Sequence, residues 1–415
     1  MNDWKEEFGK AVLLWTEREK IASSIYSSRD RDEIAQLVQL EVEYEQITSV
    51  LAANTSLAEL SNYLELQLPI GNESTQVSIH IILKSQHAPL VDMLLERLKS
   101  KESYFHQKIS RVLRVCEQDI IVSFCRKAYA LSLPWVEDQF AEVIGKNMLA
   151  EFSAFYINGG RVLNPTMSIV SMLGYLGSPD FVPPLLQIVQ DEAEDILIRR
   201  LSAKSLLMCG DDRGMEFYRM AFDKRLDDAT LAFTIGRYAS KSEIQFLIEQ
   251  LPEISAVDAL VATLRSLGFS GDINVIEQLL PYLSHAEEEV RAAASEGISD
   301  ITGEWNVDQF GAEEELVSFW RSWLSENIDQ FDKGVRYEDG EPFSLATQAS
   351  LLLDTDRESR EVRHEALMIF SGLHLPFDER SYYANQYNQA SLWTTEIEPL
   401  AGPLEATWIR SGHPV

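Results

Sequence analysis

The sequence repeats a pattern of paired apolar segments between about residue 165 and residue 303. Each unit has an apolar run with helical spacing, a small residue, a short polar turn and a second apolar run. The small residues lie about 30 positions apart, a period typical of helical solenoids. They are Gly177, Gly210, Ala239 and Gly268. Because one such helix pair cannot bury its own apolar face, neighbouring pairs must stack. The repeat therefore predicts an all-α, right-handed solenoid.

The composition is that of a packed, acidic protein. The chain has 415 residues, of which 45% are hydrophobic, and 36 Lys and Arg against 66 Asp and Glu give a formal net charge of −30. A surface with this charge repels phosphate backbones and anionic lipids, which disfavours nucleic acid and membranes as partners. The charge either serves solubility alone or steers a basic protein partner.

The cysteines and the N-terminus bear on the cellular compartment. Cys116, Cys125 and Cys209 lie in apolar helical sequence without a Cys-x-x-Cys pair, which predicts buried free thiols in a reducing compartment. The N-terminus carries charges where a signal peptide needs its apolar run. No window approaches the roughly 18 uninterrupted apolar residues of a transmembrane helix. These features predict a cytoplasmic protein.

Three segments are expected along the chain. Residues 1–55 should form a helical hairpin, because apolar residues recur at helical spacing on both sides of a polar break. Residues 56–304 should hold the HEAT-like helix pairs. Residues 305–415 are expected to form a C-terminal cap over the last apolar face. We expect an irregular tail from about Gln386, because proline and glycine recur in that part.

Residues 285–303 are the most regular repeat. They run from an acidic turn through Val-Arg and an Ala-rich helix to a closing Gly. Arg291 is expected near the start of this helix, where it would bridge to acidic turn residues of a neighbour. This form resembles HEAT-type repeats, including the short variety of bilin lyases.

Three longer stretches carry a second pattern. Residues 13–51 combine a Leu-Trp helix ending in Arg, a short break and a long helix that begins near an Asp. Residues 176–210 combine a Gly-Ser-Pro-Asp turn, a Val-Pro helix start and an Ala-containing helix. Residues 319–344 hold paired tryptophans, an Asn and a Phe-x-x-Gly-x-Arg-Tyr-x-x-Gly-x-Pro run. These residues are Trp320, Trp323, Asn327, Phe331, Gly334, Arg336, Tyr337, Gly340 and Pro342.

Together these stretches resemble a bacterial family of HEAT-repeat proteins associated with type VI secretion systems. The likeness spans nearly the whole chain, although Pro184 stands where a Trp often follows Val-Pro in that family. The resemblance implies a cytoplasmic adaptor or scaffold that works with spike, effector or effector-chaperone components. It brings no catalytic residues to carry over.

Motifs for catalysis, cofactors or metals are not found in the sequence. The seven histidines lack zinc-ligand spacing, and the phosphate loops and nucleophile elbows of enzymes do not occur. Acidic clusters at 191–195, 287–289 and 313–315 would suit general acids or metal ligands. Each also falls at an expected helix start, where carboxylates complement the helix dipole. We therefore predict a non-enzymatic protein without a cofactor or a metal.

The binding surface has several candidates. Basic residues scattered between Lys84 and Lys127, including Arg111 and Arg114, form either a solvated face or an anion-binding face. Arg336 and Tyr337 lie between glycines at a turn, where they either cap the solenoid or contact a partner, because Tyr and Arg are enriched in interface hot spots. The candidate partner contacts are Arg336, Tyr337 and Arg291.

Two function classes remain open. A scaffold that binds other proteins predicts a broad acidic face with few buried ionisable groups. The alternative is a HEAT-fold enzyme or a DNA-glycosylase-like repair protein, which predicts a deep groove holding converging polar residues or a basic stripe.

Overall fold

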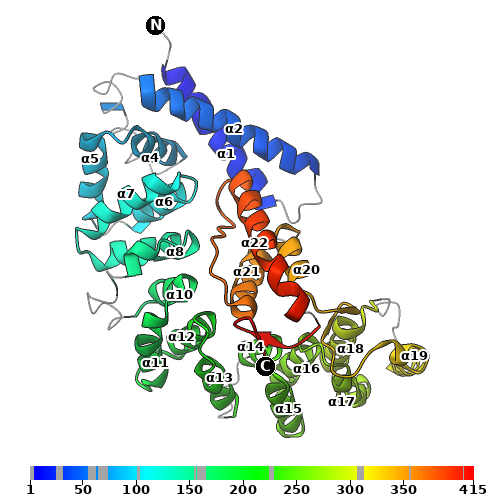
Figure 1. Cartoon of the computed structure of the whole chain (residues 1–415). Coiled ribbons are helices and arrows are strands. Elements are labelled where there is room, and N and C mark those ends of the chain that lie inside the picture. Colours follow the sequence, from blue (N-terminus) through cyan, green and yellow to red (C-terminus); the bar gives the residue numbers. More distant parts are fainter. Residues whose placement is uncertain are drawn as a thin grey trace. The chain divides into compact units, whose positions relative to one another are not determined.

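The computed structural model describes residues 4–24, 31–54, 62–63, 73–100, 103–153, 156, 165–223, 229–305, 313–354, 357–404 and 406–415. These residues are predominantly helical, with two short antiparallel strand pairs, so the all-α prediction is confirmed (Figure 1). No described helix combines the length and the apolar character needed to cross a membrane.

The described residues form two compact units. Unit 1 comprises residues 1–180, 350–364 and 374–393, and unit 2 comprises residues 181–349, 365–373 and 394–415. This division differs from the three expected segments, because the C-terminal part of the chain contributes to both units. The chain passes between the units within two long helices, α21 (Arg357–Ser371) and α22 (Tyr383–Leu404).

Unit 1 begins with the expected helical hairpin. Its other helices follow in pairs along the chain. The helices are α1 (Trp4–Ser24), α2 (Arg31–Asn54), α4 (Glu73–Ser85), α5 (Ala88–Leu98), α6 (Ser103–Leu113), α7 (Gln118–Tyr129), α8 (Pro134–Lys146) and α10 (Met167–Leu176), with a short 3₁₀ helix at Ala150–Phe152. Helices α1 and α2 pack against each other, with the Trp15 and Tyr44 ring centroids 5.2 Å apart. The Trp15 indole also donates to Gln76 Oε1 in α4, which joins the hairpin to the rest of the unit.

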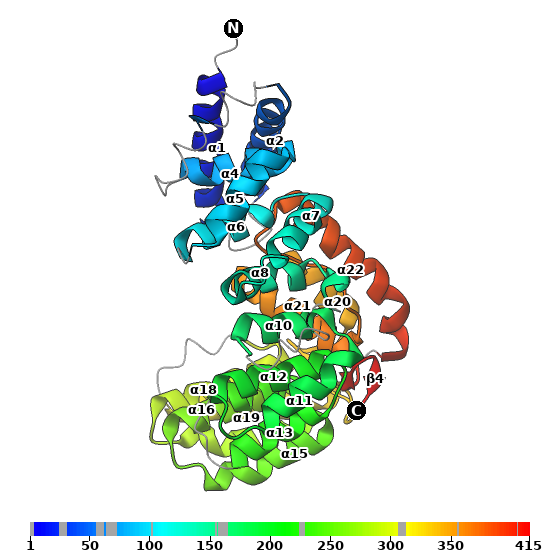
Figure 2. The same ribbon diagram turned by 90° about the vertical axis from the view of Figure 1, so that its left-hand side faces the viewer.

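Unit 2 contains most of the sequence repeat. Its helices are α11 (Val182–Gln190), α12 (Ile196–Met208), α13 (Arg213–Asp223), α14 (Ala229–Arg237), α15 (Lys241–Gln250), α16 (Val257–Phe269), α17 (Ile276–Leu279), α18 (Glu288–Thr302) and α19 (Glu313–Asn327), with 3₁₀ turns at Leu251–Glu253, Ile273–Val275, Leu280–Ser284 and Ile328–Gln330. Helices α11 to α15 each pack against the next helix along the chain, and α17 packs against α18. Helix α16 also packs against both α14 and α18, and Figure 2 shows α16 and α18 side by side. The helix pairs predicted from the four repeat units are present.

Small residues allow the closest helix approach in unit 2. A Cβ built on Gly268 in α16 would lie 2.5 Å from the Gly297 Cα in α18. The small-residue positions of the repeat therefore serve helix packing as well as turns. At Gly210 and Gly303 the backbone has φ of +79° and +73°, a conformation that favours glycine after a helix.

The remaining elements belong to the C-terminal part of the chain. They are β1 (Tyr337–Glu338), β2 (Glu341–Pro342), α20 (Leu345–Ser350), a 3₁₀ helix at Leu351–Leu353, α21, α22, β3 (Ile409–Arg410) and β4 (His413–Pro414). Strands β1 and β2 pair with Tyr337 opposite Pro342, and β3 and β4 pair with Ile409 opposite Pro414. The expected irregular tail from Gln386 is wrong, because α22 continues to Leu404. Ala390, Trp393 and Ile397 are buried at helical spacing, and this stripe outweighs the helix-breaking tendency of the prolines.

The two strand pairs of unit 2 follow one edge made by helix C-termini. The Arg336 guanidinium donates to the carbonyl oxygens of Arg237 and Phe269, at the ends of α14 and α16. The backbone amides of Asp339 and Gly340 donate to the carbonyls of Asp300 and Ile301 in the last turn of α18. The Arg410 guanidinium bonds Asp212, which follows α12, and the Tyr238 carbonyl, which follows α14.

The C-termini of α12, α14, α16 and α18 therefore lie along this edge, and their N-termini lie along the opposite edge. The strand pairs satisfy carbonyl groups that helix ends leave unbonded. Among the residues that the structure describes, α19, whose Trp320 indole donates to Ser295 Oγ in α18, covers the last repeat as the expected cap would.

Candidate functional site

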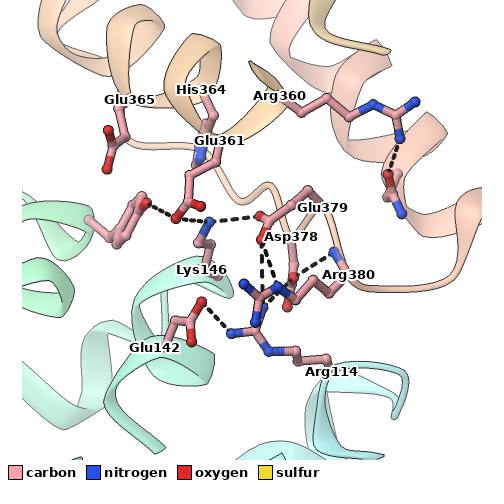
Figure 3. A network of polar contacts seen from close by, with 12 residues as sticks. Arg114, Glu142, Lys146, Arg360, Glu361, His364, Glu365, Asp378, Glu379 and Arg380 are labelled. Carbon is pink, nitrogen blue, oxygen red and sulfur yellow. Dashed lines mark hydrogen bonds and ion pairs between the residues drawn. The ribbon is translucent and has the colours of Figure 1, made fainter. Parts of the chain in front are cut away.

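The most unusual chemical feature is a network of buried ion pairs in unit 1. Lys146, the last residue of α8, is fully buried, and its Nζ lies 2.8 Å from Glu361 Oε1 and 2.7 Å from Glu379 Oε2 (Figure 3). Glu361 comes from α21, and Glu379 from the segment between α21 and α22. The Tyr175 ring lies 5.1 Å from the same Nζ. Helix α8 is thus joined to the C-terminal part of the chain through one ammonium group.

A second buried cation lies close to the first. Arg114 directly follows α6, and its Nη1 lies 2.9 Å from Asp378 Oδ1 and 3.9 Å from Glu379 Oε1. Its Nη2 lies 2.5 Å from Glu142 Oε1 in α8. Figure 3 shows these side chains converging from α6, α8 and the segment before α22.

A third buried cation connects the hairpin to the same segment. The Arg18 Nε in α1 lies 3.1 Å from Glu41 Oε1 in α2, and its Nη2 donates to the Ser381 carbonyl. The Tyr383 amide in turn donates to Glu41 Oε2 at 2.8 Å. Lys146 in α8, Arg114 directly after α6 and Arg18 in α1 therefore bind residues between 378 and 381, and Glu41 binds the Tyr383 amide.

The pKa directions follow from burial and pairing. Burial alone would raise the pKa of Glu379, but Lys146 and Arg114 outweigh it and hold that pKa below its usual range. Burial raises the pKa of Asp378, and the charge of Glu379 adds to the effect. For Lys146, the carboxylates overcome desolvation and raise the pKa. The lysine therefore stays charged, while Asp378 has the stronger tendency to take up a proton.

A cavity of about 320 Å³ opens beside this network. Its wall combines guanidinium and carboxylate groups from α1, α6, α21 and the segment before α22. The lining residues are Arg18, Glu19, Arg111, Arg114, Glu361, Glu379 and Arg380. Arg18 and Arg114 are buried, whereas Arg111 and Arg380 are exposed.

Three carboxylates of the network meet the spacing of a metal site. Oxygen atoms of Glu142, Glu361 and Glu379 lie within 4.8 Å of one another. However, Lys146 Nζ bonds two of these groups and Arg114 bonds the third. A divalent cation would have to share the carboxylates with two buried positive charges, so the residues present fit an ion-pair network better than a metal site.

The predicted contact residues occupy different positions. Arg336 and Tyr337 are 4% and 6% exposed. The Arg336 guanidinium lies 4.2 Å from the Phe343 ring centroid, and the Tyr337 ring packs against Phe331. These contacts agree with the capping alternative, because an interface anchor would need an exposed side chain.

Arg291 differs from its expected pairing. It is half-buried in the first turn of α18, and its Nη1 donates to the carbonyls of His285 and Ala286. The guanidinium therefore bonds backbone groups of its own turn, where the sequence suggested acidic residues of a neighbour.

The acidic clusters of the sequence lie at helix starts, as expected. Asp195 caps α12 by accepting a hydrogen bond from the Leu197 amide at 2.7 Å. The cluster at 287–289 opens α18 and is exposed. Glu314 and Glu315 in the first turn of α19 are exposed as well.

Burial shifts the pKa values of the three cysteines and of two histidines away from neutral pH. Cys116 and Cys125 are buried and Cys209 half-buried, all as free thiols, and burial raises the pKa of Cys209 to about 12. Burial lowers the pKa of His80 and of His364 to about 3. The expected free thiols are confirmed.

Sequence reasoning missed most of the buried network. Arg114 belongs to the basic run that it noted, but Arg18, Lys146, Asp378 and Glu379 drew no attention. One feature of the sequence could have indicated the network: the charged Asp-Glu-Arg at 378–380 directly follows the apolar Leu-Pro-Phe.

No protein-family model matches the sequence, and no curated protein matches it either.

Proposed function

We propose that this chain is a non-enzymatic, cytoplasmic scaffold that binds another protein, and that helices α11–α18 form a right-handed HEAT-like solenoid. The stacking of successive helix pairs in unit 2 supports the solenoid. Repeat folds of this kind present long surfaces on which partners dock without a catalytic centre.

The observation that carries this proposal is an acidic edge on unit 2. The N-termini of α12, α16 and α18 lie opposite the edge covered by the strand pairs. Exposed carboxylates gather at these helix starts. They are Asp191, Glu192, Asp195, Glu253, Asp258, Glu287, Glu288 and Glu289. The helix dipoles stabilise these carboxylates, and a row of such side chains attracts a basic partner and speeds its association.

The resemblance to the type VI secretion family supports a choice of partner. We infer that the partner is a spike, effector or effector-chaperone component of such an apparatus. The inferred partner surface is rich in Lys and Arg, because it must complement the acidic edge.

Affinity purification from the native host tests this proposal. The tagged chain at moderate salt should recover secretion components, identified by mass spectrometry. The triple variant E287K/E288K/E289K should lose them, because it reverses three charges on the acidic edge. The matched control is E6K/E7K, which reverses two exposed charges on α1. Equal recovery with wild type and E287K/E288K/E289K would rule out this edge, and recovery of nucleic acid alone would rule out the scaffold.

One observation favours the alternative class. The scaffold hypothesis expected few buried ionisable groups, and unit 1 contains a network of them beside a cavity. A HEAT-fold protein that uses a polar groove would be built this way. Recovery of a bound small molecule from the purified chain would shift the assignment to this alternative.

A further inference from the structure

We propose that the arginine-lined cavity of unit 1 binds a small oxyanion, namely a phosphate or carboxylate group. This goes beyond the protein-binding function proposed above and does not depend on it. The site would be formed by Arg111 and Arg380 in the exposed part of the wall, with Arg114 and Arg18 behind them.

The two exposed arginines have hydrogen-bonding capacity to spare. Arg111 makes no ion pair with any residue that the structure describes. Arg380 lies 3.4 Å from Glu379 Oε1 through its Nε alone, and its side chain is 48% exposed. Each guanidinium has five N–H donors in a planar fork. Most of the donors of this pair therefore remain available to a ligand.

The carboxylates in the wall are already engaged by other cations. Glu361 and Glu379 bond Lys146, and Glu19 lies 2.5 Å from Arg18 Nη1. The seven lining residues carry four positive and three negative charges, and Glu41, Glu142 and Asp378 pair with Arg18 and Arg114 behind the wall. Arg111 and Arg380 are the exposed cations of this wall.

The size and shape of the site restrict the ligand. A volume of about 320 Å³ is at the lower end for small-molecule pockets and is far too small for a nucleic-acid duplex. Paired guanidinium forks match the planar carboxylate and the tetrahedral phosphate, which accept two parallel hydrogen bonds. Both features favour one oxyanionic group.

The positions of the basic residues between Lys84 and Lys127 agree with an oxyanion site in the cavity. Lys84 pairs with Glu45, and Arg126 with Glu151. Only Arg111 and Arg114 of that run line the cavity, where they meet two arginines that are distant in sequence. The fold therefore gathers cations that the sequence leaves scattered.

Calorimetric titration of the full chain with inorganic phosphate and, separately, with malonate tests the proposal at constant ionic strength. Wild type should show saturable binding of at least one anion. R111A/R380A should bind about tenfold more weakly or worse, because charge-assisted hydrogen bonds are lost. R111K/R380K keeps the charges without the forks and should give an intermediate affinity. The control is R321A, an exposed arginine of α19 outside the cavity wall, which should bind like wild type.

Unchanged circular dichroism and thermal unfolding in the variants would show that the fold is intact. A terminally blocked phosphoserine peptide then tests whether the oxyanion can be part of a polypeptide. Competition by this peptide would show that the cavity admits such a group, and the absence of competition would confine binding to free small anions. The proposal is overturned if neither anion binds up to about 10 mM. It is also overturned if R111A/R380A and wild type bind equally.

Discussion

Each unit buries a cation that the C-terminal part of the chain helps to hold, but the partners differ. In unit 1, Lys146 is enclosed by the carboxylates of Glu361 and Glu379. In unit 2, Arg336 donates to two helix-end carbonyls and lies 4.2 Å and 5.0 Å from the Phe343 and Phe370 ring centroids. The first cation is balanced by full negative charges, and the second by dipoles and aromatic faces.

The pKa directions express this difference. The carboxylates raise the pKa of Lys146 despite its burial. Burial lowers the pKa of Arg336 to about 10, and Glu338 offsets only part of this effect. A carboxylate network thus stabilises a buried charge more fully than carbonyl groups do. Removal of the cation from such a network should also destabilise the fold more, because it leaves other charges buried.

The largest effect is therefore expected for Lys146→Met. The substitution keeps an apolar stem of similar length but leaves the buried Glu379 without its closest cation. The free energy of unfolding should fall by about 3–5 kcal/mol, the usual cost of breaking a buried pair. Urea denaturation at pH 7 measures it.

The pH dependence separates lost charge from lost packing. Glu379 has a lowered pKa in the folded wild type, so its stabilisation is present above the unfolded pKa and disappears as pH falls. The difference between wild type and K146M should therefore shrink below about pH 5. The control R126A breaks an exposed pair and should cost less than about 1 kcal/mol. A pH-independent loss in K146M would mean that packing, and not charge, is the cause.

A smaller effect is expected for Arg336→Met. No buried carboxylate is left behind, but the carbonyls of Arg237 and Phe269 lose a donor. The cost should be about 2 kcal/mol, the scale of a hydrogen bond to a charged group. Hydrogen exchange should also speed up at the Tyr337 amide, which bonds the Gly271 carbonyl. If R336M were as costly as K146M, the proposed difference between the two kinds of partner would be incorrect.

The helical part of the fold was predictable because it depends on local patterns. The repeat between Gly177 and Gly303 gave the helix pairs, and the spacing around Trp15 and Tyr44 gave the hairpin. The prediction of an irregular tail was wrong at α22, where the buried apolar stripe through Trp393 outweighs the helix-breaking tendency of Pro399. Local breaker residues are thus weaker evidence than an apolar stripe with helical spacing.

The candidate site was not predictable, because its members are far apart in the sequence. Lys146 and Glu379 are separated by 233 positions, and Arg114 and Asp378 by 264. Each residue on its own looks like an ordinary surface charge. Their burial follows from the return of residues 374–393 to unit 1, which no local pattern indicates.

The smallest effect, and the only stabilising one, is expected at Asp300 in the last turn of α18. Burial and then the charges of Asp339, Glu296 and Glu338 raise its pKa to about 7. The folded state therefore binds more protons than the unfolded state between about pH 4 and pH 7, and stability declines as pH rises through this window.

Asp300→Asn should remove this cost and stabilise the protein by on the order of 1 kcal/mol at pH 8, a value reduced for partial exposure. The gain should nearly vanish by about pH 3, where the carboxyl is mostly protonated in both states. Thermal unfolding at the two pH values measures it, with the exposed Glu314→Gln as a control that should show no such change. A gain of equal size at both pH values would show that Asp300 carries no net charge penalty. The helix-end edge of unit 2 would then tolerate a carboxylate as readily as the network of unit 1 does.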